Sequence, residues 1–245
     1  IMQLNKPFSG DVLFDGKPMS RMGLGERQRL RREIQYIFQD PFASLDPRKT
    51  VGWSVAEPIR THGLLDNNRD ITRRVAELLE RVGLPASAAD RYPHQFSGGQ
   101  RQRVCIARAL ASKPRLIIAD EALSALDVSI QAQVINLFMD LQKDEGLAYL
   151  FVSHDMAVVE KMSHRVAVLY LGQIMELGSR AQVFETPAHP YTRRLLSAVP
   201  VPDPTRRPDR AALEGEVPST TMKAGEEPVP ARLTELAPGH FVANT

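Results

Sequence analysis

This sequence of 245 residues has one cysteine, no long apolar run and no large excess of charge of either sign. The lone Cys105 excludes an internal disulfide and any metal or iron–sulfur site built from several cysteines of this chain. A single thiol suits a reducing compartment, so the cytosol is favoured. No apolar stretch approaches the roughly 20 residues that span a bilayer. Any connection to a membrane is therefore expected to come through a partner.

The charge of the chain is nearly balanced. Its 31 Lys and Arg residues and 29 Asp and Glu residues leave a formal net charge of +2. This balance gives no reason to expect a nucleic-acid partner. An arginine-rich helical run over 25–33 lacks the interleaved aromatic side chains that stack on bases, which favours a solvated helix face.

Helical and strand patterns alternate along much of the chain, which predicts an α/β sheet with covering helices. The hydrophobic content of 43% is enough for a packed core. The expected helices cover about 25–33, 70–82, 97–111 and 129–143, and the expected strands cover 10–16, 34–40, 116–119, 149–152, 165–170 and 173–177.

The composition changes after about residue 199. Eight of the 18 prolines lie beyond that point, and helical or strand periodicity is lost there. We therefore expect one large domain over 1–199, with a helical subdomain at about 41–111, followed by an extended, partly ordered appendage over 200–245.

Two adjacent carboxylates, Asp120 and Glu121, follow the apolar run 116–119. They are expected at the carboxyl end of a buried strand, beside the crevice where α/β sheets bind ligands. In phosphoryl transfer the first carboxylate can hold the Mg²⁺ that bridges the β- and γ-phosphates, and the second can deprotonate the attacking water. We assign Asp120 to the metal and Glu121 to the general base. Taken alone, the pair is more typical of a strand that runs into an acidic turn.

Three other groups lie at the ends of expected elements. The Ser-Gly-Gly-Gln run at 97–100 precedes a helix, where backbone N–H groups suit a phosphate; the alternative is an ordinary serine N-cap. Gln39 and His154 each follow a strand, as Glu121 does. A histidine there can contact a γ-phosphate or the attacking water, although a lone histidine at a strand end is more often structural.

The order of these groups resembles the ATP-binding cassette (ABC) ATPase family over about residues 10–200. In that resemblance Gln39 corresponds to the Q-loop, 96–100 to the signature, Asp120 with Glu121 to the Walker B pair, 124–127 to the D-loop, and His154 to the switch histidine. The resemblance implies a P-loop NTPase-like α/β core, with a parallel-rich sheet, covering helices and an α-helical signature subdomain.

The resemblance also implies ATP hydrolysis with ATP and Mg²⁺ as cofactors. Glu121 and His154 would be catalytic, and Asp120 and Gln39 would hold Mg²⁺. The residues expected to bind ATP are Gln39, Ser97, Gly98, Gly99, Gln100 and Asp127. The signature residues would meet ATP held by the opposite member of a head-to-tail dimer.

The partners implied by the resemblance are a second ABC ATPase subunit or cassette, two transmembrane permease subunits and a periplasmic or extracellular solute-binding protein, with no nucleic acid. The implied location is peripheral, on the cytoplasmic face of the plasma or inner membrane. Three stretches, 34–48, 125–133 and 189–193, resemble the oligopeptide, dipeptide and nickel importer ATPases. The cysteine-free tail is most similar to the second cassette of the glutathione-importing branch, which implies that the chain energises import of dipeptides, oligopeptides or glutathione.

The family's P-loop motif, G-x-x-x-x-G-K-[ST], does not occur in the sequence. The nearest string, Gly16-Lys17-Pro18, lacks the earlier glycine and the hydroxyl. We expect the motif to precede Ile1, and the chain as it stands to bind ATP weakly at best and hydrolyse none. Two alternatives stay open: a non-catalytic cassette half that only docks on a partner, and a soluble ABC ATPase that acts on nucleic acid.

Overall fold

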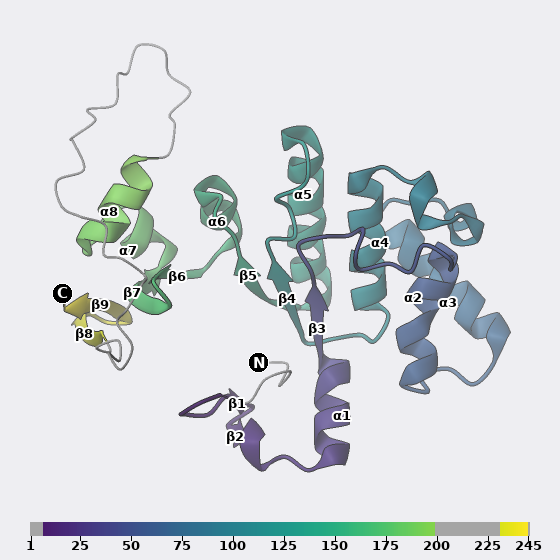
Figure 1. Cartoon of the computed structure of the whole chain (residues 1–245), viewed down its shortest axis with the longest axis horizontal. Helices are drawn as coiled ribbons and strands as arrows, with labels where there is room; N and C mark the ends of the chain where they lie inside the picture. The colour runs from purple at the N-terminus through teal and green to yellow at the C-terminus, as the bar shows by residue number, and fades with distance from the viewer. Residues whose placement is uncertain (1–6, 199–230, 245) are drawn as a thin grey trace, which may run out of the picture. The chain divides into compact units, whose positions relative to one another are not determined.

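The structure is a computed structural model that describes residues 7–198 and 231–244 (Figure 1). It divides into two compact units, residues 1–154 and 155–245. The predicted boundary at 199/200 lies outside the described residues. No described helix combines the length and the apolar character needed to cross a membrane.

A parallel sheet forms the centre of the first unit (Figure 1). Its three strands, in the order β3-β4-β5, are Ile34–Ile37, Leu116–Asp120 and Ala148–Val152. The register pairs Ile37 with Ala119, and Asp120 with Val152. The carboxyl ends of all three strands therefore lie at one edge of the sheet, as predicted for the strands that precede Gln39, Glu121 and His154.

The central strand β4 lies in the hydrophobic core. Ile117 and Ala119 are 0% exposed, and Ile118 is 5% exposed, because a central parallel strand is covered on both faces. Helix α5 (Val128–Glu145) buries Phe138, which packs edge-on against Tyr149 and Phe151 of β5. The predicted apolar strand and the predicted helix after it are confirmed.

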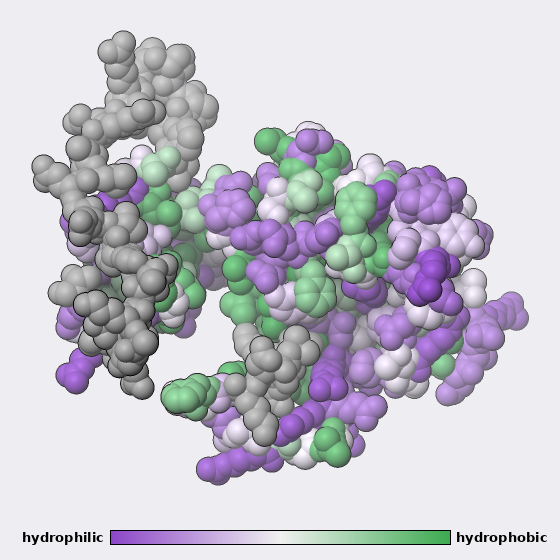
Figure 2. Space-filling model, viewed as in Figure 1, coloured by the Kyte–Doolittle hydropathy of each residue, from purple (hydrophilic) through white to green (hydrophobic). Residues whose placement is uncertain are grey.

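A helical subdomain precedes β4 in the chain. It contains α2 (Val51–Thr61), α3 (Asn68–Arg81), the short 3₁₀ helices Ala86–Asp90 and Pro93–Gln95, and α4 (Gly98–Leu110). Helix α3, predicted over 70–82, buries Ile71, Val75, Leu78 and Leu79. The Asn67 side chain caps its first turn by accepting a hydrogen bond from the N–H of Asp70. Figure 2 shows mostly hydrophilic and neutral residues on the visible face of this subdomain.

Helix α2 was predicted only as part of the helical subdomain, and it contains Pro58. A proline inside a helix removes one backbone hydrogen bond and crowds the preceding turn. Burial offsets this cost, since Val51, Val55 and Ile59 are at most 1% exposed. Gly52 allows close packing, because a Cβ there would lie 2.9 Å from the carbonyl oxygen of Ala89.

The first residues of the unit form a small hairpin and a helix. Strands β1 (Leu13–Phe14) and β2 (Lys17–Pro18) pair antiparallel, so the strand predicted over 10–16 is shorter than expected. After a 3₁₀ turn, Met19–Arg21, helix α1 (Leu24–Glu33) leads into β3. Its arginines lie mainly on exposed positions, in agreement with the predicted solvated face.

The second unit is built on a four-stranded antiparallel sheet with the order β6-β7-β9-β8. Its elements in chain order are α6 (Met156–Met162), β6 (Arg165–Tyr170), β7 (Gln173–Ser179), α7 (Arg180–Phe184), α8 (Pro190–Ser197), β8 (Arg232–Ala237) and β9 (His240–Asn244). Strands β6 and β7 were predicted. The β8–β9 hairpin was not, since an extended appendage was expected there.

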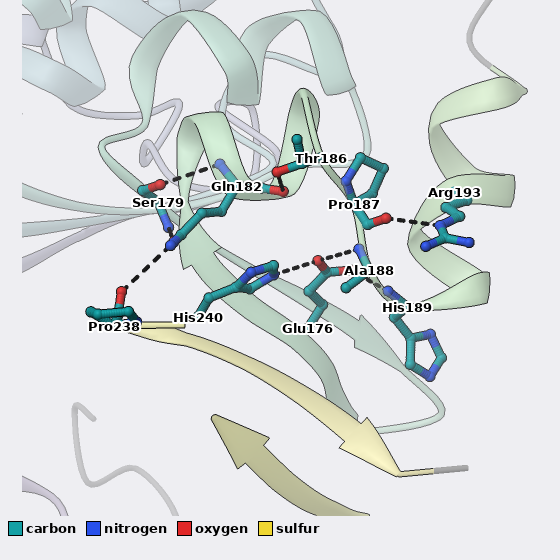
Figure 3. Close-up of polar contacts among 10 residues, drawn as sticks. All are labelled: Glu176, Ser179, Gln182, Thr186, Pro187, Ala188, His189, Arg193, Pro238 and His240. Atoms are coloured by element: carbon teal, nitrogen blue, oxygen red, sulfur yellow. Dashed lines mark hydrogen bonds and ion pairs between the residues drawn. The ribbon is translucent and has the colours of Figure 1, made fainter. Parts of the chain in front are cut away.

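A buried carboxylate joins the hairpin to the rest of the second unit (Figure 3). Glu176 of β7 is 0% exposed and accepts hydrogen bonds from the N–H groups of Ala188 and His189 at 2.9 and 3.0 Å. The Nε2 atom of His240, in β9, lies 2.8 Å from the same carboxylate. Burial alone would raise the pKa of Glu176, but these contacts outweigh burial and leave that pKa below its ordinary value.

Candidate active site

Three of the predicted residues meet at the carboxyl edge of the parallel sheet. The Nε2 group of Gln39 donates a hydrogen bond of 2.6 Å to Oε2 of Glu121. On the other side, Nδ1 of His154 lies 3.4 Å from Oε1 of Glu121. The side chain of His154 is 72% exposed and that of Glu121 is 31% exposed, so this contact is open to water and contributes little to stability. Its position makes it available for chemistry.

The backbone of Glu121 has an uncommon conformation. Its φ of 46° lies in the left-handed region, which costs a non-glycine residue on the order of 1–3 kcal/mol. Neighbouring contacts hold it there: its N–H donates to the Val152 carbonyl at 2.9 Å, and its own carbonyl accepts from the N–H and hydroxyl of Ser124 at 3.0 and 2.9 Å. Such strain is typical of functional residues that follow a strand.

Asp120 has a partner that lies outside the motifs of the sequence. The hydroxyl of Tyr36 donates a 2.5 Å hydrogen bond to Oδ2 of Asp120. Burial, reinforced by this hydrogen bond, raises the pKa of Tyr36 to about 12, so the phenol stays protonated and remains a donor. The signal in the sequence was weak: Tyr36 pairs with Ile118, two residues before Asp120, and only the strand register reveals this.

The signature run lies at the start of α4. Ser97 is the N-cap: its hydroxyl accepts from the N–H of Gln100 at 3.3 Å, while Oε1 of Gln100 accepts from the N–H of Ser97 at 3.0 Å. The N-cap is the alternative role considered for Ser97, and the reciprocal contact with Gln100 completes a capping box. It leaves the N–H groups of Gly98 and Gly99 without an intrahelical partner, as in the first turn of any helix.

The second signature glycine also has a packing role. A Cβ on Gly99 would lie 2.4 Å from Cγ2 of Ile130, in the first turn of α5. Asp127 is the N-cap of α5, but its side chain makes no capping hydrogen bond. Within the described part of the chain, neither the run 97–100 nor Asp127 hydrogen-bonds to Gln39, Glu121 or His154. Hydrogen bonds and close contacts thus join Gln39, Glu121 and His154 to one another but not to the signature run or to Asp127.

Two arginines of α4 contact the loop after Gln39. The guanidinium of Arg101 lies 3.7 Å from the ring centroid of Phe42, and its Nε donates to the Pro93 carbonyl at 2.7 Å. Arg108 donates to the Ser44 carbonyl at 2.5 Å. The helix that begins at the signature therefore also positions the loop that contains Gln39.

The oxygen donors at the sheet edge suit a magnesium–nucleotide complex better than a metal ion held by protein alone. Among residues 7–198 and 231–244, no group of three or more His, Cys, Asp or Glu could hold a metal ion. Mg²⁺ commonly binds one or two protein oxygens while phosphates and water complete its shell. Asp120 provides a carboxylate, and Oε1 of Gln39 provides an amide oxygen, so the residues present fit that mode.

This fold and site define a class. A parallel sheet whose strand ends carry a glutamine, a carboxylate pair and a histidine, together with a serine-capped signature helix that begins with two glycines, is an ABC-type ATPase cassette. Comparison with protein families agrees. The family described as "ABC transporter" matches residues 1–124, and the family described as "Oligopeptide/dipeptide transporter, C-terminal region" matches residues 175–225. The chain belongs to the ABC transporter family, and the predicted resemblance is confirmed.

The curated relatives are more specific. The chain is 59% identical over 244 residues to glutathione import ATP-binding proteins GsiA from Shigella flexneri and from Escherichia coli K12, and 58% identical to that of Salmonella choleraesuis. Each alignment covers 99% of this chain and 39% of the relative. The chain therefore spans about two fifths of the length of these relatives.

Two solved structures share the fold. One is the ATP-binding cassette MJ0796, described as a dimer in a post-hydrolysis state bound to ADP and Pi, with a TM-score of 0.65 and 30% identity over 74% of this chain and 77% of that one. The other is cbiO1 from Clostridium perfringens, part of the transporter complex cbiONQ, with a TM-score of 0.67 and 29% identity over 76% of this chain and 72% of that one. The predicted α/β cassette fold is confirmed.

Proposed function

We propose that this chain is the ATP-hydrolysing cassette of an importer that moves peptides, glutathione among them, across the cytoplasmic membrane. The observation that carries the proposal is the carboxylate of Glu121, held between Gln39 and His154 at the end of a buried strand. The names of the curated relatives support the glutathione assignment, and the match to the oligopeptide and dipeptide transporter region supports the wider peptide class.

Glu121 is the general base in this proposal. Its carboxylate takes a proton from the water that attacks the γ-phosphate. The Gln39 amide fixes one carboxylate oxygen, and His154 lies beside the other, where it can contact the γ-phosphate or the water. Asp120 and the amide oxygen of Gln39 would hold Mg²⁺, which neutralises phosphate charge when it is bound.

The signature acts from the opposite side of a dimer. Among the described residues, the signature run 97–100 and Asp127 share no hydrogen bond with Gln39, Glu121 or His154. They therefore suit a role toward a nucleotide held by another cassette. That cassette would lie head to tail with this one. The remaining partners are two permease subunits and a solute-binding protein, and the chain would lie peripherally on the cytoplasmic face of the inner membrane.

The test is uptake by the complete gene product, assembled with its permease subunits in vesicles. Labelled glutathione and a labelled dipeptide are supplied with the solute-binding protein, and ATP is enclosed on the cassette side. The wild type is expected to accumulate solute, and Glu121→Gln to abolish accumulation while it still binds ATP. Glu77→Gln, an exposed change on α3, is the matched control and is expected to transport normally.

Each outcome bears on a stated part of the proposal. Uptake of the dipeptide without glutathione would refute the glutathione assignment and support the peptide class. ATP binding without hydrolysis in the wild type would favour a cassette that only docks on a partner. ATPase activity that responds to nucleic acid and to no imported solute would favour the soluble alternative.

A further inference from the structure

Two hydrogen-bond donors from one segment reach the two adjacent carboxylates of the site. Tyr36, in β3, donates to Asp120, and Gln39, in the loop after β3, donates to Glu121. Gln39 is already a predicted site residue through the family resemblance, which assigns it to ATP and Mg²⁺. The Tyr36 contact has no counterpart in the proposed function and requires its own account.

The strand register explains why Tyr36 reaches Asp120. Tyr36 pairs with Ile118 in the parallel ladder, and Asp120 lies two residues further along β4, on the same face of the sheet. The tyrosine ring leans along the strand direction, and its hydroxyl arrives 2.5 Å from Oδ2 of Asp120. No backbone distortion is needed to form this contact.

The ring of Tyr36 is held by two sets of contacts. It packs against a buried cluster of Met19, Leu30, Ile34 and Ile118. Phe38 also contacts it, with a centroid separation of 4.4 Å and an interplanar angle of 43°. A ring held in this way loses little additional rotamer freedom when its hydroxyl forms a hydrogen bond, so the hydroxyl is a preorganised donor.

The hydrogen bond has a consequence for the carboxylate. A carboxylate has two oxygens and about four acceptor positions, so a donor on Oδ2 leaves Oδ1 free to bind a cation. Groups of this kind, which orient a metal ligand without touching the metal, commonly change metal affinity by about ten- to a hundredfold.

We propose that Tyr36 is a positioning residue for Asp120: its hydroxyl fixes the carboxylate so that the free oxygen faces the magnesium ion of a bound nucleotide. This inference rests on the proposed function, because it requires a nucleotide-bound metal. It adds Tyr36, which lies outside the family motifs, to the residues of the site. Tyr36 then orients the metal ligand Asp120, and Gln39 orients the base Glu121.

The test measures metal binding separately from turnover. Mn²⁺ replaces Mg²⁺ as a spectroscopic probe, and its affinity for the complete gene product is measured by electron paramagnetic resonance with a non-hydrolysable ATP analogue present. Tyr36→Phe removes only the hydroxyl and keeps the packed ring. It is expected to weaken Mn²⁺ binding by roughly tenfold, while the affinity for the nucleotide measured without metal stays the same.

Tyr149→Phe is the matched control. Tyr149 lies on β5, which pairs with β4 on the side away from β3. Its buried hydroxyl has no hydrogen-bond partner among the described residues, so removal of this hydroxyl is expected to leave Mn²⁺ affinity unchanged. In an Asp120→Asn background, Tyr36→Phe is expected to have no further effect on Mn²⁺ affinity, because the hydroxyl acts through that carboxylate.

Equal or tighter Mn²⁺ binding by Tyr36→Phe would overturn the inference; tighter binding would mean that the hydroxyl competes with the metal. An equal loss in the Tyr149→Phe control would also overturn it, since the effect would then be general. A wild type that binds no metal–nucleotide complex would refute the proposed function itself, and the two failures are therefore distinguishable.

Discussion

A methyl group added at Gly99 is predicted to destabilise the first unit, whereas the same methyl group at Gly98 is predicted to be tolerated. The two glycines are adjacent in the signature and both begin α4. A Cβ at position 99 would lie 2.4 Å from Cγ2 of Ile130, while the nearest atom to a Cβ at position 98 is Cδ2 of Leu126, at 3.9 Å. The first distance is a steric overlap and the second an ordinary contact.

The cost at Gly99 follows from the stiffness of its neighbour. Ile130 is branched at Cβ, so its Cγ2 cannot turn away without leaving a preferred rotamer. Overpacking of this kind costs about 1–3 kcal/mol. For a unit of this size we expect Gly99→Ala to lower the melting temperature by roughly 2–12 °C. Gly98→Ala is expected to shift it by less than about 2 °C.

The assay is thermal unfolding followed by circular dichroism, with Ile130→Ala as the compensating change. Removing the Ile130 side chain beyond Cβ relieves the overlap, so Gly99→Ala should cost less in the Ile130→Ala background than in the wild type. Equal melting temperatures for Gly98→Ala and Gly99→Ala would refute this reasoning. So would the absence of any coupling between positions 99 and 130 in the double-mutant cycle.

Two further predictions concern titratable groups. Hydrogen bonds lower the pKa of Glu176, and burial lowers the pKa of His189, so the second unit should lose stability as pH falls. The contribution of the His189 imidazole declines below its unfolded pKa, about 6.5, and the contribution of the Glu176 carboxylate declines below its unfolded pKa, about 4.3. Hydrogen exchange of the β7 and β9 amides, corrected for intrinsic rates, should therefore show less protection at acid pH. Glu176→Gln should flatten this pH dependence in the range where the carboxylate titrates. Protection that rises toward acid pH would contradict the role given to these two groups. Burial raises the pKa of Cys105 to about 11, so a thiol reagent at pH 8 should modify it only after unfolding, and rapid labelling of the native protein would be inconsistent with this burial.

Much of the first unit could be predicted from the sequence, because its signals are local. The apolar run before Asp120 can only be a strand covered on both faces, and Ser97 with Gln100 has the pattern of a capping box. Strand ends then indicated where Gln39 and His154 would lie. Those two residues do meet at Glu121.

The missed features depend on tertiary contacts. Helix α2 contains Pro58, which local propensity disfavours, and only burial of its apolar face compensates. The β8–β9 hairpin follows a proline-rich stretch, and its His240 is anchored by Glu176, which lies far away in the sequence. The Tyr36 contact requires the register of β3 on β4, which no pattern within either strand specifies.

The most direct test of the central claim, that Glu121 is the general base, is single-turnover ATP hydrolysis by the complete gene product. The comparison is between the wild type and Glu121→Gln, in a background where any second cassette has its own catalytic glutamate replaced. The predicted result is unchanged ATP affinity, with a hydrolysis rate at least about a hundredfold lower in Glu121→Gln. Hydrolysis by Glu121→Gln at the wild-type rate would contradict the assignment of Glu121 as the base.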